Sequence, residues 1–287
     1  MRRDSHLRAR QPTVLLVATV LALAGCGATG DPLQQAVHAA TRTLALPGVG
    51  YDLTLNRSSL FGSWRMPVRG RAVYDPHAGL GYEKLVLENQ DGTSLALYLD
   101  ILPTRLLVAP FPLRAGVLPE GKSWISAPLT ARADAGTSRR LIAQAVGLTP
   151  ELALDELAWG AQAISFAGER VVDHVPMREY RVSVNLAKAL SAARSAGKPS
   201  IAAAIEHEVG TLGSSRTPGL AVTIWVNGSG YVARLTTTVP GSGLGTTSFS
   251  FFDFSTKVPR NLPHPDQTVS LRSLDASRTL WATASGT

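Results

Sequence analysis

The sequence predicts an α+β fold, in which several α-helices cover a single large, curved antiparallel β-sheet of about ten or eleven strands. Two observations predict it. From Tyr51 onward, apolar residues alternate with polar ones at a period of two, and turn residues separate these segments at short intervals. Segments with helical spacing, several of them rich in alanine, lie before the first of these strands and between the later ones. Short strands joined by close turns are typical of an antiparallel meander.

The first 26 residues have the features of a bacterial lipoprotein signal peptide. Arginines precede an apolar segment, Thr13 to Leu23, which is too short to span a membrane. Leu23-Ala24-Gly25-Cys26 then resembles a lipobox. That resemblance implies that the thiol of Cys26 carries a diacylglyceryl anchor of the palmitate type and that the mature chain begins there. The alternative is an ordinary secretory signal with an incidental cysteine.

We therefore expect three segments: a signal peptide (1–25), a lipidated tether (26–30) and one lipid-binding-type α+β domain (31–287). No internal repeat or linker divides the last segment. After Cys26, no uninterrupted apolar run reaches the roughly 18 residues of a transmembrane helix. The expected location is the cell membrane, with the protein anchored by lipid on the extracytoplasmic face.

The charge and the cysteine content of the chain exclude some classes of function. The formal net charge of the chain is +7, and four arginines and one aspartate of the signal account for part of it, so the mature chain keeps a mild positive excess. For an exported chain we expect anionic lipid headgroups, and no nucleic acid, to be the partner of this charge; each Lys or Arg near such a surface contributes about 1 kcal/mol. Cys26 is the only cysteine, and the lack of any cysteine after it excludes a disulfide framework and a thiol-ligated metal in the domain.

The first half of the domain is expected to form one helix and then strands. Asp31, Pro32 and Gln34 form a capping-box pattern, and the helix they start ends at Pro47-Gly48. The strands expected after it are 51–55, 64–74, 82–88, 94–102, 106–109 and a strand after the turn 119–123.

The second half is expected to begin with helices and to return to strands. Helices are predicted at 137–146, from Thr149 through Leu157, at 186–196 with Asn185 as N-cap, and at 200–209. Strands are predicted at 163–170 and 178–184, joined by a polar loop that contains Val175-Pro176. Further strands are predicted at 220–226, 231–239, 248–254 and, at an edge, 268–271.

Strand parity predicts an apolar inner face of the sheet, opposite helices that are rich in alanine. Small side chains on these helices are consistent with a cavity, and equally with helices that pack close to the sheet. The predicted lining residues are Leu53, Leu55, Trp64, Met66, Val68, Leu95, Leu97, Leu99, Leu106, Val108, Ile224, Val226, Phe249 and Phe251.

No catalytic, metal or cofactor pattern accompanies this face, so we expect the protein not to be an enzyme. The six histidines are scattered, and His207 between two glutamates lacks the second histidine of a zinc helix. No Gly-x-Ser-x-Gly nucleophile elbow is present. Adjacent Asp155 and Glu156 are expected to lie on a solvated helix face.

The order of motifs in the mature chain resembles the LppX/LprAFG family of actinobacterial lipoproteins. The similarity is loose at each position but spans nearly the whole mature chain. The motifs that carry it are the lipobox at Cys26, Val73-Tyr74-Asp75-Pro76, the segment 119–125, Tyr180-Arg181-Val182, the segments 222–226 and 230–234, and Phe252-Asp253-Phe254. The resemblance implies a half-open β-barrel, similar to the LolA/LolB fold, with helices over an apolar cavity that holds lipid acyl chains.

Two functions follow as hypotheses. The first is a membrane-anchored carrier that binds a lipid or lipoglycan acyl chain and moves it through the cell envelope, with an envelope lipid transporter as a further partner. The second is a surface-anchored interaction or sensor module with a filled core and no lipid cargo. A monomer is expected in both cases.

Overall fold

The computed structural model describes residues 31–56, 65–88, 92, 94–111, 118–128, 147, 149–211, 219–238, 245–259 and 262–270. The chain divides into two units, residues 1–31 and 32–287. All helices and strands described below belong to the second unit. No helix among the described residues combines the length and the apolar character that a membrane span requires.

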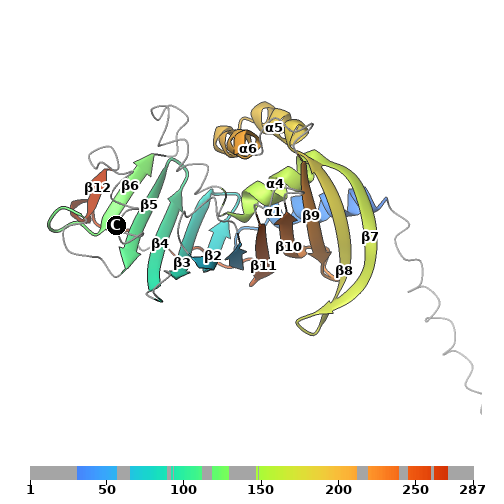
Figure 1. Ribbon diagram of the computed structural model, residues 1–287, viewed down its shortest axis with the longest axis horizontal. Coiled ribbons are helices and arrows are strands. Elements are labelled where there is room, and N and C mark those ends of the chain that lie inside the picture. The colour runs from blue at the N-terminus through green and yellow to red at the C-terminus, as the bar shows by residue number, and fades with distance from the viewer. Residues whose placement is uncertain are drawn as a thin grey trace, which may run out of the picture. The chain divides into compact units, whose positions relative to one another are not determined.

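Twelve strands form one sheet, in the order β12-β6-β5-β4-β3-β2-β1-β11-β10-β9-β8-β7 (Figure 1). Neighbouring strands are antiparallel except β12 and β6, which run parallel. Within the described sheet, β12 and β7 are the two edges, so the sheet is open. The predicted fold class, a large antiparallel sheet with several helices, is confirmed. The strands are β1 (Val49–Leu55), β2 (Arg65–Asp75), β3 (Leu80–Glu88), β4 (Ser94–Leu102), β5 (Arg105–Phe111), β6 (Trp124–Pro128), β7 (Ala161–Val172), β8 (Val175–Asn185), β9 (Gly219–Val226), β10 (Val232–Thr238), β11 (Thr246–Phe252) and β12 (Thr268–Ser270).

Four α-helices accompany the sheet, and local sequence explains where they begin and end. They are α1 (Pro32–Leu44), α4 (Pro150–Gly160), α5 (Leu186–Ser195) and α6 (Pro199–Thr211). Proline is the first residue of three of them, where its missing N–H costs nothing. The Asn185 side chain accepts a hydrogen bond from the backbone N–H of Lys188 and caps α5, as predicted.

The helices make their main contacts with one end of the sheet. Helix α1 contacts β7 to β10, while α4 contacts β7 and β8, and α5 contacts β8. Helix α4 also packs against both α1 and α5, and α5 packs against α6. We call the sheet face toward these helices the inner face. The opposite, outer face carries solvated charge pairs such as Arg71–Asp52, whose side chains are largely exposed.

The structure corrects two details of the strand predictions. Val175 and Pro176 are not in a loop: they start β8, because β7 and β8 form one long hairpin that turns at Asp173-His174. Both turn residues have positive φ, a conformation that Asp and His adopt more readily than most residues do. Strand β11 ends at Phe252, two residues earlier than predicted. The helix predicted at 137–146 lies outside the described residues.

Candidate functional site

The register of the strands aligns inner-face side chains into rows that cross the sheet. One row crosses nine strands and begins with two aromatic rings whose centroids lie 5.4 Å apart. It consists of Phe166, Tyr180, Ile224, Leu235, Phe249, Leu53, Gly70, Leu85 and Leu97. Apart from the half-exposed Phe166 and from Gly70, which has no side chain, its members are buried apolar or aromatic residues. The inner face is therefore an apolar surface that extends well beyond the strands that the helices mainly contact.

A second, parallel row crosses eight strands, from β11 to β12, and shares the strands β11, β1, β2, β3 and β4 with the first row. It consists of Phe251, Tyr51, Ala72, Glu83, Leu99, Val108, Ile125 and Val269. The rings of Tyr51, Phe249 and Phe251 lie against one another across the two rows, with centroids 5.8 to 6.4 Å apart. Every member of this row is apolar or aromatic except Glu83.

Of the residues predicted to line a cavity, those whose side chains the structure describes fall on this inner face. Eleven of them are buried, and Leu95 is partly buried against the same core. The buried ones are Leu53, Leu55, Val68, Leu97, Leu99, Leu106, Val108, Ile224, Val226, Phe249 and Phe251. Their alternation is therefore as strand parity predicted, while the cavity itself stays a prediction. Cys26 and Trp64, and the side chain of Met66, lie outside the described residues.

Glu83 is a polar residue of this face that the sequence analysis missed. It is fully buried, and neither of its carboxyl oxygens has a hydrogen-bond partner among the described residues. Burial raises the pKa of Glu83 well above its ordinary value, which favours the neutral form of the carboxyl. The signal was present in the sequence: Glu83 shares its strand parity with Leu85 and Leu87, both of which are fully buried.

The carboxyl of Glu83 lies over Gly70, next to the first row. A Cβ atom added at Gly70 would be 3.2 Å from Oε1 of Glu83 and 2.6 Å from Cδ2 of Leu85. Because Gly70 has no side chain, there is room at this position for the carboxyl of Glu83 and for the side chain of Leu85. The phenol of Tyr51, in the same row as Glu83, is buried. Burial is the main cause that raises the pKa of Tyr51, and Glu83 and Tyr74 add to that shift.

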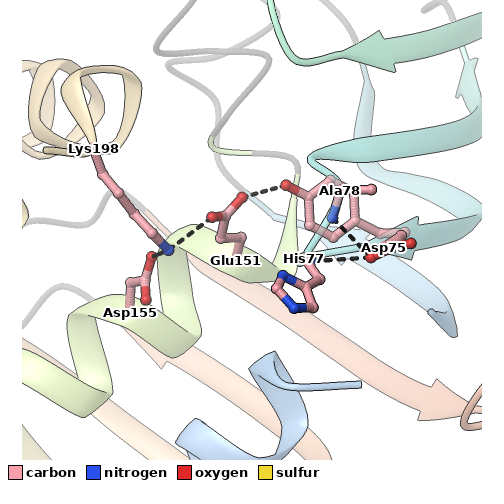
Figure 2. A network of polar contacts seen from close by, with 7 residues as sticks. Asp75, His77, Ala78, Glu151, Asp155 and Lys198 are labelled. Carbon is pink, nitrogen blue, oxygen red and sulfur yellow. Dashed lines mark hydrogen bonds and ion pairs between the residues drawn. The ribbon is translucent and has the colours of Figure 1, made fainter. Parts of the chain in front are cut away.

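A second polar group links the sheet to the helices (Figure 2). The Tyr74 hydroxyl donates a hydrogen bond to Glu151 of α4. Lys198 Nζ lies 3.0 Å from Glu151 Oε1 and 2.8 Å from Asp155 Oδ2, and 5.4 Å from the centre of the Trp159 ring. This group therefore joins β2, α4 and the junction of α5 with α6.

Local structure places Lys198 at that junction. Gly197 follows α5 with a φ of 67°, and the N–H groups of Gly197 and Lys198 donate hydrogen bonds to the carbonyls of Arg194 and Ala193. These are the two bonds of a Schellman motif, which favours glycine because of the positive φ. The chain then turns directly into Pro199, the first residue of α6.

The prediction that Asp155 and Glu156 lie on a solvated helix face is wrong. Both residues are 2% exposed, because α4 packs against α1, α5 and the sheet and has no wide solvent face. Burial raises the pKa of Asp155 to about 6, although the hydrogen bond and the positive charge of Lys198 oppose that shift. Burial alone would lower the pKa of Lys198, but Asp155 and Glu151 outweigh it and raise that pKa.

The remaining polar groups near the site are structural. Asp75 Oδ1 accepts hydrogen bonds of 3.0 Å from the backbone N–H groups of His77 and Ala78, which fixes the turn from β2 to β3 (Figure 2). Within the described part of the chain, no three His, Cys, Asp or Glu side chains gather as metal ligands would.

Comparison with solved structures finds proteins of low sequence identity. The lipoprotein LppX from Mycobacterium tuberculosis is 13% identical and matches over 80% of this chain and 99% of its own, with a TM-score of 0.45. LprF from Mycobacterium bovis is 14% identical, with coverages of 81% and 96% and a TM-score of 0.46. A LolA-superfamily protein from Nitrosomonas europaea is 9% identical, with coverages of 80% and 93% and a TM-score of 0.25.

LppX and LprF carry names of the group that the sequence resembles. No protein-family model matches the chain, and no curated protein sequence does.

Proposed function

We propose that this protein is an envelope lipoprotein, anchored in the cell membrane through Cys26, that binds the acyl chains of a lipid or lipoglycan on its inner sheet face and carries them through the envelope. Residues 1–25 are then the signal peptide, 26–30 the tether and 31–287 the carrier domain. The protein acts as a monomer on the extracytoplasmic side, without chemistry of its own, and receives or delivers lipid at an envelope transporter.

The observation that carries the proposal is the size of the apolar inner face compared with the helices opposite it. Together the two rows run from β7 to β12, whereas the described helices mainly contact β7 to β10. The buried side chains of α1 and α5 are mostly small, among them Ala36, Ala39, Ala40, Ala189 and Ala193. Helices α4 and α6 also bury larger side chains, such as Leu154 and Ile205.

The energetics of such binding need no catalytic group. Each methylene of an acyl chain that leaves water for an apolar face contributes about 0.8 kcal/mol. Two long chains would therefore bind firmly through burial alone, and release would require a membrane or a second protein to offer an equally apolar environment.

Leu97→Trp tests whether the inner face takes up lipid. Leu97 pairs with Leu85 in the first row. If the face binds acyl chains, the indole ring occupies their place, so uptake of a fluorescent lipid is lost and the thermal midpoint stays near that of the parent. Val86→Trp, on the outer face of the neighbouring strand and 37% exposed, is the matched control and should change neither quantity.

The alternative, an interaction module with a filled core, gives the opposite pair of results. A tryptophan forced into a packed core should cost about 1–3 kcal/mol of stability. Clear destabilisation by Leu97→Trp, with no lipid uptake even by the parent protein, would therefore support the alternative and contradict lipid carriage.

A further inference from the structure

We propose that Glu83 is the polar contact for the bound lipid, with its protonated carboxyl donating a hydrogen bond to an ester carbonyl of an acyl chain on the inner face. This inference rests on the proposed function and adds the chemical class of the ligand, an ester-linked lipid. It also assigns a specificity-determining residue.

The first argument is the lack of any partner for Glu83 among the described residues. Glu83 is fully buried, and its carboxyl group has no hydrogen bond there. A buried polar group left unpaired costs roughly 1–3 kcal/mol, and nearly all such groups in folded proteins are satisfied. Apolar neighbours occupy the paired positions on both sides, Ala72 on β2 and Leu99 on β4. A partner supplied by a ligand removes this cost only when the ligand is bound.

The second argument is where the carboxyl lies. Its Oε1 is held over Gly70, at the boundary between the two apolar rows, because Gly70 has no side chain to occupy that space. An acyl chain lying along the inner face passes this point. The carboxyl is thus placed to meet a polar atom of such a chain.

The third argument is chemical complementarity. A neutral carboxylic acid offers one O–H donor and a carbonyl acceptor, and burial favours that neutral form of Glu83. Burial is the cause of this shift, and no cation among the described residues lowers the pKa of Glu83. A neutral ester carbonyl, which accepts a hydrogen bond and brings no charge into the apolar face, is the complementary group.

The experiment is a competition between two lipids for the full-length protein in nonionic detergent. A diacylglycerol and the dialkyl ether of the same chain length are added in equal amounts, and native mass spectrometry reads the ratio of the two complexes directly. We expect the ester to be preferred by about two- to tenfold, the amount that one neutral hydrogen bond supplies.

Two variants assign this preference to Glu83. Glu83→Gln keeps a neutral donor and should keep the preference, whereas Glu83→Leu should still take up lipid but bind both compounds equally. Glu88→Gln, the same change on an exposed residue of β3, should behave as the parent does. The thermal midpoint of each variant shows that it is folded.

The outcomes separate this inference from the proposed function. If the parent binds ester and ether equally, or if Glu83→Leu keeps the preference of the parent, the role of Glu83 is wrong and lipid carriage stands. If the parent binds neither lipid, the proposed function fails, and this inference fails with it. The parent ratio alone can overturn the inference, so the test does not depend on Glu83→Leu folding.

Discussion

Glu83 places an ionisable group among leucine side chains. Even without a ligand, this should make the free energy of unfolding depend on pH. Its pKa is raised in the folded protein, and in the unfolded chain it returns to the ordinary value of about 4.3. At low pH the carboxyl is protonated in both the folded and the unfolded protein, so its burial lowers the free energy of unfolding least. As pH rises, the unfolded chain loses this proton first, which favours unfolding.

Glu83→Gln should therefore remove part of the pH dependence of unfolding. The parent and the variant should have similar free energies of unfolding near pH 4. From about pH 5 upward the parent should lose stability relative to the variant, by more than about 1 kcal/mol at high pH. Urea unfolding across this pH range measures the difference.

Comparing parent and variant at each pH cancels the titration of other acids, such as Asp155, whose pKa is raised to about 6. A constant difference between the two proteins at every pH would show that Glu83 titrates normally and is not held neutral by burial.

Sequence alone predicts single residues well where strand parity decides the outcome. Leu97, Leu99 and Phe249 lie on the inner face as expected. Strand parity also places Glu83 on the inner face. Because glutamate is polar, however, the sequence did not single it out as a residue of that apolar face. Asp155 was wrongly expected in solvent, because neither its burial by α1 and α5 nor its partner Lys198, 43 residues later in the chain, follows from local sequence.

At the scale of elements, Lys198 holds the junction of α5 and α6 against α4. Its ammonium group contacts two carboxylates of α4, and Glu151 in turn binds Tyr74 of β2. The side chain of Asp155 is 3% exposed and that of Lys198 is 37% exposed. Loss of the lysine would leave a buried carboxylate without its cation, which costs more than the pair contributes.

Lys198→Met should lower the free energy of unfolding by about 1–3 kcal/mol, because Asp155 and Glu151 lose a charged hydrogen-bond donor. The matched control is Arg194→Met, which removes the ion pair with Glu206 between two exposed side chains of α5 and α6. Such surface pairs contribute only about 0–1 kcal/mol. Equal losses in the two variants, measured by urea unfolding, would refute the role given to Lys198.

Elements with strong local signals were predicted closely. The strand 94–102 has the predicted bounds, and α5 begins after the predicted cap Asn185. The length of the β7–β8 hairpin was underestimated, because Pro176 suggested a loop. Proline is tolerated there, since β9 pairs with β8 only from Arg178 onward and the N–H that Pro176 lacks is not needed on that side.

At the scale of the whole molecule, the account joins an anchor to a carrier domain. The anchor is inferred from Leu23-Ala24-Gly25-Cys26 alone, and the carrier function from the inner face of the sheet. The two parts can be tested separately, because lipid uptake by the domain does not require the thiol of Cys26.

Cys26→Ala should abolish covalent lipid labelling and move the protein from the membrane to the soluble fraction or the medium. The reason is that several acyl chains are needed for stable anchoring, and all of them would depend on this thiol and on the processing that follows its acylation. Metabolic labelling with a fatty acid and cell fractionation measure both effects. Unchanged labelling and membrane binding of the Cys26→Ala protein would exclude a lipoprotein anchor at this position.

The most direct test of the central claim is native mass spectrometry of the full-length protein purified from its own membranes. The account predicts a noncovalent lipid, present in addition to the covalent anchor, that leaves on gentle collisional activation and is taken up again when diacyl lipid is added. A mass that corresponds to the anchored chain alone, with no uptake of added lipid, would contradict the claim that the inner face of the sheet binds acyl chains.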